Sequence, residues 1–134
     1  MDEKILETFE NPTEPLKDKQ DYLINIELPE YTSLCPRTGN PDFAVIVVSY
    51  VPDKLCVELK SLKLFISSFR DDKVFHEAVT NRIFSVLRKL LEPKYLRVIG
   101  DFNRRGNVKT VVTVQKKFKP FEDVEIPDYK PKII

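Results

Sequence analysis

The sequence predicts an α+β domain built on an antiparallel sheet, with two helices between its second and third strands. Residues 24–28 alternate apolar and polar side chains, which predicts a strand with one buried face. Residues 43–51 form a nearly continuous, β-branched apolar run, which predicts a central strand covered on both faces. Residues 95–102 and 108–115 alternate around a polar turn, which predicts a hairpin. Because apolar residues at helical spacing fill the stretch between these two pairs, the predicted order is ββααββ.

Prolines and helical periodicity set the expected boundaries of the elements. Pro29 is expected to stop the first strand and Pro52 the second. Residues 59–69 fit a strand by alternation, but we predict a helix because one apolar face continues for about three turns. The acidic pair at 71–72 is expected to cap the next helix, which should end at Glu92. The expected buried stripe of that helix consists of Phe75, Val79, Ile83, Val86, Leu87 and Leu90.

Length and charge limit the possible functions. Residues 1–134 are enough for one domain with one core. In such a small chain, neighbouring subunits can supply some of the residues that line the active site. Residues 1–20 and 116–134 are polar and proline-containing, so they are expected to form an extended N-terminal arm and an extended C-terminal tail. Twenty-two basic against 21 acidic residues give a net charge of +1, which indicates no surface for nucleic acid or for an anionic membrane.

The cysteine content indicates a reducing compartment. The chain has two cysteines, no recognisable leader and no apolar run of membrane-spanning length. We therefore expect a cytoplasmic protein with free thiols rather than a disulfide framework, and a bridge between Cys35 and Cys56 is not expected.

Cys35 is the one cysteine that lies in a polar, turn-forming loop. Pro36 disfavours helical geometry at Cys35, and the Gly-Asn-Pro run at 39–41 makes the chain turn, so the thiol is expected to be displayed. Asp42 closes the loop and is expected to carry a carboxyl group near the sulfur. A thiol nucleophile and a proton donor are the minimum for covalent chemistry on an unsaturated carbon. An ordinary surface loop with an inert cysteine is the alternative.

Two further groups of polar residues are candidates for binding. Lys60 and Lys63 lie three apart on the predicted helix with Ser61 beside them, an arrangement that suits dinucleotide phosphates. A solvated polar face is the commoner explanation for two such lysines. His76 and Glu77 stand at the start of the next helix, where an ionised Glu suits the ring N–H and exocyclic amine of a guanine-like base. An ordinary polar helix edge is again the alternative.

Two blocks of the chain resemble the 7-cyano-7-deazaguanine reductases, the nitrile reductases of queuosine biosynthesis. Residues 33–43, Ser-Leu-Cys-Pro-Arg-Thr-Gly-Asn-Pro-Asp-Phe, resemble the nucleophile loop of that family. Residues 58–65, Glu-Leu-Lys-Ser-Leu-Lys-Leu-Phe, match its signature at every position and follow the cysteine loop in the right order. The His76-Glu77 pair resembles its substrate-binding dipeptide, and the resemblance extends over residues 6–114.

The resemblance implies a fold, a reaction and an assembly. The fold is the tunnelling fold, in which antiparallel sheets of several subunits close into a barrel with the helices outside. The reaction is NADPH-dependent reduction of 7-cyano-7-deazaguanine to 7-aminomethyl-7-deazaguanine through a thioimide on Cys35, with Asp42 as the proton donor. The assembly is a homo-oligomer, a decamer of two pentameric rings, with active sites at subunit interfaces. The implied substrate-binding residues are Val57, Glu58, Leu59, His76 and Glu77, and the implied cofactor-binding residues are Lys60, Ser61, Lys63 and Arg105.

One departure from the family pattern concerns the hairpin turn. The family usually shows Arg-Gly-Gly where this chain has Arg-Gly-Asn at 105–107. Asn tolerates a positive φ better than most residues, so the turn geometry can persist. The departure makes the cofactor role of Arg105 less secure than that of the two lysines.

Three alternative functions remain open. Zinc serves the related GTP cyclohydrolases, and Cys35, Cys56 and His76 are conceivable ligands, but without a Cys-x-x-Cys pair or a second His we predict no metal. The archaeal amidinotransferase relative would form the same thioimide on a tRNA-borne base and add ammonia instead of hydride. A ring-forming protein that binds the base without catalysis is the third.

Overall fold

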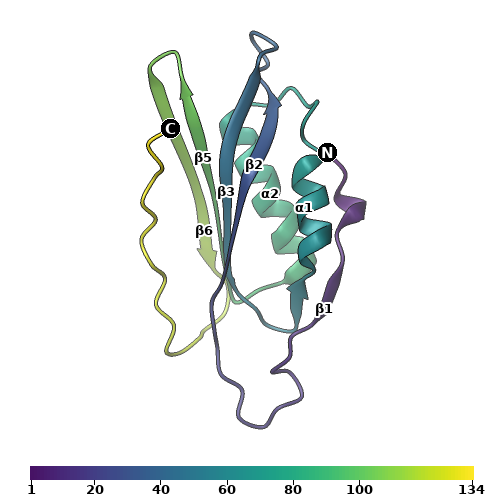
Figure 1. The fold of residues 1–134 in the computed structure, drawn as a ribbon. Helices are drawn as coiled ribbons and strands as arrows, with labels where there is room; N and C mark the ends of the chain where they lie inside the picture. The colour runs from purple at the N-terminus through teal and green to yellow at the C-terminus, as the bar shows by residue number, and fades with distance from the viewer.

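The computed structural model describes residues 1–134 and has the predicted α+β order of elements (Figure 1). The main sheet has four antiparallel strands in the order β2-β3-β5-β6. The two helices are inserted between β3 and β5 and cover one face of the sheet (Figure 1). The strands are β2 (Ile24–Leu34), β3 (Pro41–Val51), β5 (Tyr95–Arg105) and β6 (Val108–Lys117), and the helices are α1 (Leu59–Ser67) and α2 (His76–Leu91).

The main core lies between the helices and the sheet. On β3 the alternate residues Ile46 and Val48 face the helices and are fully buried, as period-two alternation requires. Val45 and Val47 point to the opposite face and are also buried, so β3 is covered on both faces as its apolar sequence predicts. The helices contribute Leu62, Phe65 and Ile66 from α1 and Val79, Ile83 and Leu87 from α2. Neither helix has the length and apolarity that crossing a bilayer requires.

The C-terminal segment, residues 118–134, begins with Phe118 packed against Phe84 of α2 and continues to the sheet face that the helices leave open, where Tyr129 packs against the second core cluster (Figure 1, yellow). It contains no helix or strand, and polar contacts hold it in place. The buried carboxylate of Asp101 accepts hydrogen bonds from the Tyr129 hydroxyl and the Lys109 amine, both at 2.5 Å. Arg97 donates to the carbonyl of Pro127 at 2.7 Å. The tail is therefore packed against the sheet through buried polar groups.

The N-terminal arm is also attached to the domain. Within it, β1 (Thr8–Glu10) pairs with β4 (Leu55–Val57) in a small second sheet. A 3₁₀ turn (Glu3–Ile5) precedes β1, and the buried side-chain amide of Asn11 donates to the carbonyl of Asp53 at 2.7 Å. These two strands could not be predicted from the sequence, because three residues are too few to show a period.

Two expected boundaries are wrong. Pro29 does not stop the first strand, since β2 continues to Leu34 through an irregularity between Leu28 and Tyr31. A proline is tolerated there because β2 is an edge strand, where a missing N–H removes no ladder hydrogen bond.

The second wrong boundary is the acidic cap of α2. The N-cap residue is Phe75, which makes no side-chain capping hydrogen bond. Asp72 instead binds the amino group of Met1 at 2.7 Å, and Asp71 precedes the helix by several residues. Phe75 is 54% exposed, so the buried stripe of α2 begins one turn later, at Val79.

Candidate active site

The hairpin formed by β2 and β3 presents Cys35 at the end of the sheet. Leu34 and Pro41 are the last paired residues of the two strands. Beyond them the Cys35 N–H donates to the Asn40 carbonyl at 2.8 Å, and the Gly39 N–H donates to the Cys35 carbonyl at 2.9 Å. Gly39 has φ +75°, in the left-handed region that favours glycine. The Cys35 side chain is half-buried, so the sulfur is neither sealed in the core nor fully in solvent.

Hydrogen bonding within this loop lowers the pKa of the Cys35 thiol below its ordinary value. The Thr38 hydroxyl has the largest effect, followed by the backbone N–H groups of Thr38 and Arg37. Partial burial and the negative charge of Asp42 act in the opposite direction. Because the thiolate is the nucleophilic form of cysteine, the loop favours a reactive sulfur. From the sequence, Arg37 and backbone N–H groups are candidates for this effect; Thr38 was missed, although its hydroxyl three residues after the cysteine is a visible signal.

The β2–β3 hairpin carries Asp42 near the Cys35 loop. Ser33 is the cross-strand partner of Asp42, so the two side chains project from the same face of the sheet. Cys35 lies two residues beyond Ser33, just past the end of β2. The negative charge of Asp42 raises the pKa of the Cys35 thiol, so the carboxylate is close enough to act on the sulfur electrostatically.

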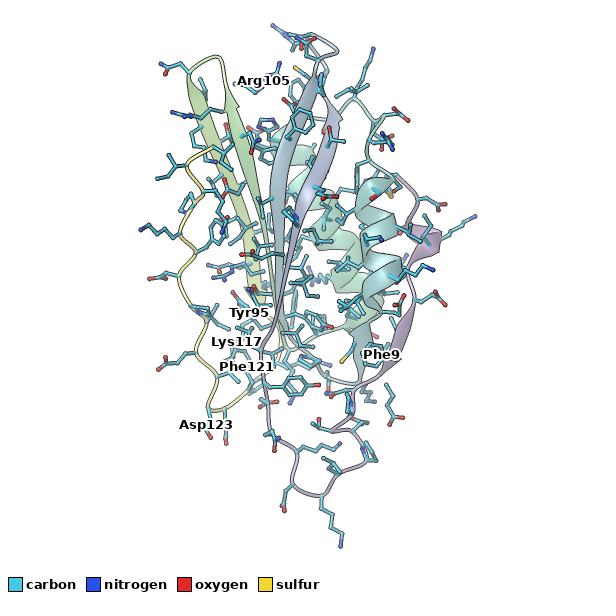
Figure 2. The ribbon with its side chains drawn as sticks, in the orientation of Figure 1. Phe9, Tyr95, Arg105, Lys117, Phe121 and Asp123 are labelled. Carbon is cyan, nitrogen blue, oxygen red and sulfur yellow. The ribbon has the colours of Figure 1, made fainter.

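Asp42, His76 and Arg105 form a charged group that we call the Asp42 cluster. The Asp42 side chain is only 6% exposed, and each of its oxygens faces a basic side chain. Arg105, at the end of β5, binds Oδ1 and also donates to the Pro41 carbonyl at 3.0 Å. His76, the first residue of α2, places Nε2 3.3 Å from Oδ2. Figure 2 shows Arg105 at the end of the sheet that carries the hairpin loop.

Ring stacking fixes the orientation of His76. Its imidazole lies against the Phe102 ring with the centroids 3.8 Å apart and the planes 7° from parallel. Phe102 is fully buried, so the contact gives the imidazole a rigid support. Glu77 follows His76 and is exposed, and its carboxylate makes no ion pair. It is therefore free to accept hydrogen bonds from a ligand.

The residues that the resemblance implies for binding the cofactor, together with three of those implied for binding the substrate base, lie at the start of α1. We call residues 57–61 and Lys63 the α1 group. Glu58 is the N-cap: its Oε2 accepts from the Lys60 N–H at 2.9 Å and its Oε1 from the Ser61 N–H at 2.8 Å. These two bonds are the main cause of the lowered pKa of Glu58. Leu59, Lys60 and Lys63 are exposed, whereas Val57 is buried in the core.

Ser61 is committed to contacts within the chain. It is 2% exposed, and its hydroxyl donates to the Glu58 carbonyl at 2.7 Å and accepts from the Glu7 N–H at 3.0 Å. The hydroxyl thus joins the N-terminal arm to the start of α1, a role that the sequence did not reveal.

The Asp42 cluster and the α1 group lie toward opposite ends of the sheet. β3 begins beside the Cys35 loop and its eleven residues extend for about 35 Å before β4 and α1 follow. Figure 1 shows α1 starting at the far end from the β2–β3 loop. Within one chain the structure therefore brings Asp42, His76 and Arg105 into contact, with Cys35 in the adjoining loop and Glu77 next to His76 on α2, but it does not bring the α1 group to them.

Comparison with known proteins identifies the family. A family model described as "QueF-like protein" matches residues 41–120, from the start of β3 past the end of β6. The chain belongs to this family. A relative from Nitrosospira multiformis, named NADPH-dependent 7-cyano-7-deazaguanine reductase, is 54% identical over 86% of this chain and 80% of its own length. Proteins of the same name from Aquifex aeolicus (53%, covering 82% of each chain) and Methylobacillus flagellatus (47%, covering 95% and 91%) are similar to it over comparable lengths.

A solved structure confirms the fold of this QueF-like chain. The crystal structure of the archaeosine synthase QueF-Like in the apo form superposes with a TM-score of 0.69, covering 76% of this chain and 100% of that one. At 20% identity this likeness concerns the fold alone. The chain therefore has the tunnelling-fold module that the sequence resemblance implied.

The cysteines of this QueF-like chain are both free, and Cys56 is buried near the Tyr22 hydroxyl, 3.9 Å from its sulfur. The structure contains no group of three or more His, Cys, Asp or Glu side chains placed to hold a metal ion. The hypothetical set of Cys35, Cys56 and His76 is thus not assembled in the chain.

Proposed function

We propose that this protein reduces the nitrile of 7-cyano-7-deazaguanine to 7-aminomethyl-7-deazaguanine with NADPH, a step of queuosine biosynthesis. The observation that carries the proposal is the β2–β3 hairpin, whose loop holds a thiol of lowered pKa and whose second strand holds, within electrostatic reach of that thiol, a carboxyl group bound by His76 and Arg105. Relatives about half identical to this chain bear the name of that enzyme.

The first step is addition of the thiol to the nitrile. The Cys35 thiol gives its proton to the Asp42 carboxylate. The resulting thiolate forms a bond to the nitrile carbon, one π bond of the nitrile breaks, and its electrons take that proton back from Asp42 at nitrogen. The product is a covalent thioimide, a better hydride acceptor than the nitrile. The Arg105 guanidinium stabilises the carboxylate that remains after the proton leaves, and His76 contacts its other oxygen.

We assign binding of the deazaguanine base to residues of both the Asp42 cluster, with the adjacent Glu77, and the α1 group. The free carboxylate of Glu77 can accept from the ring N–H and the exocyclic amine of a guanine-like base, while His76 flanks it on a fixed ring. The base-binding residues Val57, Glu58 and Leu59 that the resemblance implies lie at the opposite end of the sheet from Glu77. The Glu58 carboxylate already accepts two backbone N–H groups, so its remaining acceptor positions are those available to the base.

The implied cofactor-binding residues include cationic hydrogen-bond donors that suit the phosphate oxygens of NADPH. Lys60 and Lys63 expose their amines on α1 and suit phosphate oxygens. Arg105 is half-exposed, so its guanidinium has donors left beyond those that bind Asp42 and Pro41. Ser61 is buried and offers no free hydroxyl in this chain. When bound, NADPH supplies the hydride equivalents, two for each nitrile.

A complete site requires a second copy of the chain, because the α1 group lies far from Cys35 in the same chain. The outer strands β2 and β6 leave sheet edges open, and ring assembly pairs such edges. We assign a homo-oligomer, a decamer of two pentameric rings, in which α1 of one subunit approaches the Cys35 loop of another. Light scattering after size exclusion tests the mass, and a monomer with full activity would contradict the shared site.

The cellular compartment follows from the thiol chemistry. A mechanism that begins with a free Cys35 thiolate suits the reducing cytoplasm, and both cysteines are unbridged in the structure. We therefore assign the enzyme to the cytoplasm.

Substrate-dependent oxidation of NADPH is the direct test of the function. The wild-type protein should consume two NADPH for each 7-cyano-7-deazaguanine, and Cys35→Ala should consume none. Cys56→Ala is the matched control, because that thiol is buried beside the Tyr22 hydroxyl and takes no part in the proposed reaction. Turnover by Cys35→Ala would contradict the covalent route. Incorporation of ammonia without NADPH consumption would indicate the amidinotransferase reaction instead.

A further inference from the structure

Two buried hydroxyls lie on the same sheet face as Asp42. Tyr31 and Ser33 alternate on β2 and are 1% and 0% exposed. Their cross-strand partners on β3 are Ala44 and Asp42, respectively. Since opposing residues share a face and their Cβ atoms are about 5 Å apart, the Ser33 hydroxyl is within reach of the Asp42 carboxylate after a side-chain rotation.

Neither hydroxyl has a hydrogen-bond partner in the structure. Most buried polar groups in proteins are paired, and an unpaired buried hydroxyl costs free energy. Packing does not explain the Tyr31 hydroxyl, because a phenyl ring would keep the edge contact with Phe102 at 6.0 Å and the contact with Phe69 at 6.1 Å. An unpaired polar atom at this position indicates a use in the chemistry of the adjacent site.

The pKa of Tyr31 responds to both Ser33 and Asp42. Burial raises the pKa of Tyr31 to about 12, the nearby Ser33 hydroxyl lowers it, and the negative charges of Asp42 and Asp72 raise it. The phenol is therefore a neutral donor at any working pH, with Ser33 beside it.

The Asp42 carboxylate can accept further hydrogen bonds. Arg105 occupies one position on Oδ1, and His76 lies 3.3 Å from Oδ2. An ionised carboxylate offers about four acceptor positions, so two remain for other donors. The Asp42 cluster brings its basic groups from α2 and β5, whereas Tyr31 and Ser33 approach from β2.

We propose that Tyr31 and Ser33 form a hydroxyl relay that stabilises the Asp42 carboxylate once it has given its proton to the nitrile nitrogen. The Tyr31 O–H donates to Ser33 Oγ, and the Ser33 O–H donates to Asp42. Each bond in such a chain polarises the next, and both strengthen as negative charge develops on Asp42. The inference rests on the proposed function, in which Asp42 is the acid. Tyr31 and Ser33 act through Asp42, so they are positioning residues that favour thioimide formation rather than substrate binding.

Hydroxyl deletion tests the relay. Tyr31→Phe and Ser33→Ala each remove one hydroxyl and little else. The measurements are kcat and KM for NADPH-dependent nitrile reduction, the rate of thioimide formation when the nitrile is mixed with enzyme alone, and Tm. We expect kcat and the rate of thioimide formation to fall about tenfold in Ser33→Ala with KM unchanged, because a hydrogen bond to the charged Asp42 is lost. The fall should be smaller in Tyr31→Phe, which removes only the bond that polarises the Ser33 hydroxyl. We expect Tm to be unchanged or raised, because an unpaired buried hydroxyl is removed.

A second tyrosine provides the matched control. Tyr95→Phe removes a hydroxyl that donates to Gln115 Oε1 at 3.0 Å, at the end of β5 opposite Arg105 (Figure 2). It should lower Tm slightly and leave kcat and thioimide formation unchanged.

Three results would overturn the proposal. Wild-type rates of thioimide formation in both variants would exclude the relay while leaving the proposed function intact. A fall in kcat/KM that lies wholly in KM would indicate a role in binding instead. Absence of any nitrile-dependent NADPH consumption by the wild-type enzyme would overturn both the relay and the proposed function.

Discussion

At Gly100 the Thr80 side chain of α2 packs directly on β5, so replacing this glycine with alanine should perturb both stability and the site. A Cβ at Gly100 would lie 2.5 Å from Thr80 Oγ1 and 2.6 Å from the Phe102 ring. Both neighbours are fully buried, so they can move only by displacing the packing around them. Overpacking of this kind costs about 1–3 kcal/mol. For a chain of 134 residues, that corresponds to a fall in Tm of roughly 3–12 °C.

The same two neighbours fix the position of His76. The Thr80 hydroxyl donates to the His76 carbonyl at 2.8 Å, and the Phe102 ring stacks on the imidazole. Gly100→Ala should therefore also weaken nitrile binding, because it shifts the start of α2 on which His76 and Glu77 lie.

Thermal unfolding at fixed protein concentration, combined with a double-mutant cycle, measures this effect. Thr80→Ala removes one of the two clashing atoms, so Gly100→Ala should cost less in the Thr80→Ala background than in wild type. The rescue should be partial because the Phe102 ring remains. A Gly100→Ala protein within about 0.5 kcal/mol of wild type would refute the close packing of α2 on β5, and strict additivity would refute Thr80 as the contact.

Two further predictions concern charged groups. Because the folded pKa of Glu58 is lowered, its stabilising contribution is present above its ordinary value of 4.5 and is lost as pH falls through the folded pKa. Glu58→Gln should thus be less stable than wild type at pH 7, and the difference in stability should shrink in acid. Thermal unfolding at several pH values measures this difference, and a difference that does not change with pH would contradict the capping role. Asp101→Asn should cost about 1–3 kcal/mol, because the charge that holds Lys109 and Tyr129 is removed. Proteolysis should then cut residues 118–134 faster, and unchanged cleavage would contradict the anchoring role.

The fold was predictable where one segment carries its own period. The apolar run of β3 and the helical stripes of α1 and α2 repeat often enough to be recognised, and the structure confirms them except at their first residues, since Leu59 and Phe75 are exposed. The turn at Gly106 and Asn107 was also predictable, since both have positive φ, at 55° and 70°. The pairing of β1 with β4 was not, because it joins short segments far apart in the sequence.

The parts of the site that the sequence indicated are those carried by local geometry. The proline and glycine of the Cys35 loop show that it turns, and a loop of that kind exposes its side chains. The Asp42 cluster depends instead on where β5 and α2 end relative to β3, which only the tertiary structure fixes. The burial of Ser61 likewise depends on the distant Glu7. Contacts between remote segments leave no pattern in a single sequence.

Mass mapping of the covalent adduct tests the central claim most directly. The protein is mixed with 7-cyano-7-deazaguanine without NADPH, quenched and digested. Addition to a nitrile releases no leaving group, so the peptide containing Cys35 should gain the whole mass of the substrate. The peptide containing Cys56 should be unchanged, since that thiol is 2% exposed. Absence of the adduct from Cys35 under conditions in which the enzyme turns over, or an adduct on Cys56 alone, would contradict the account.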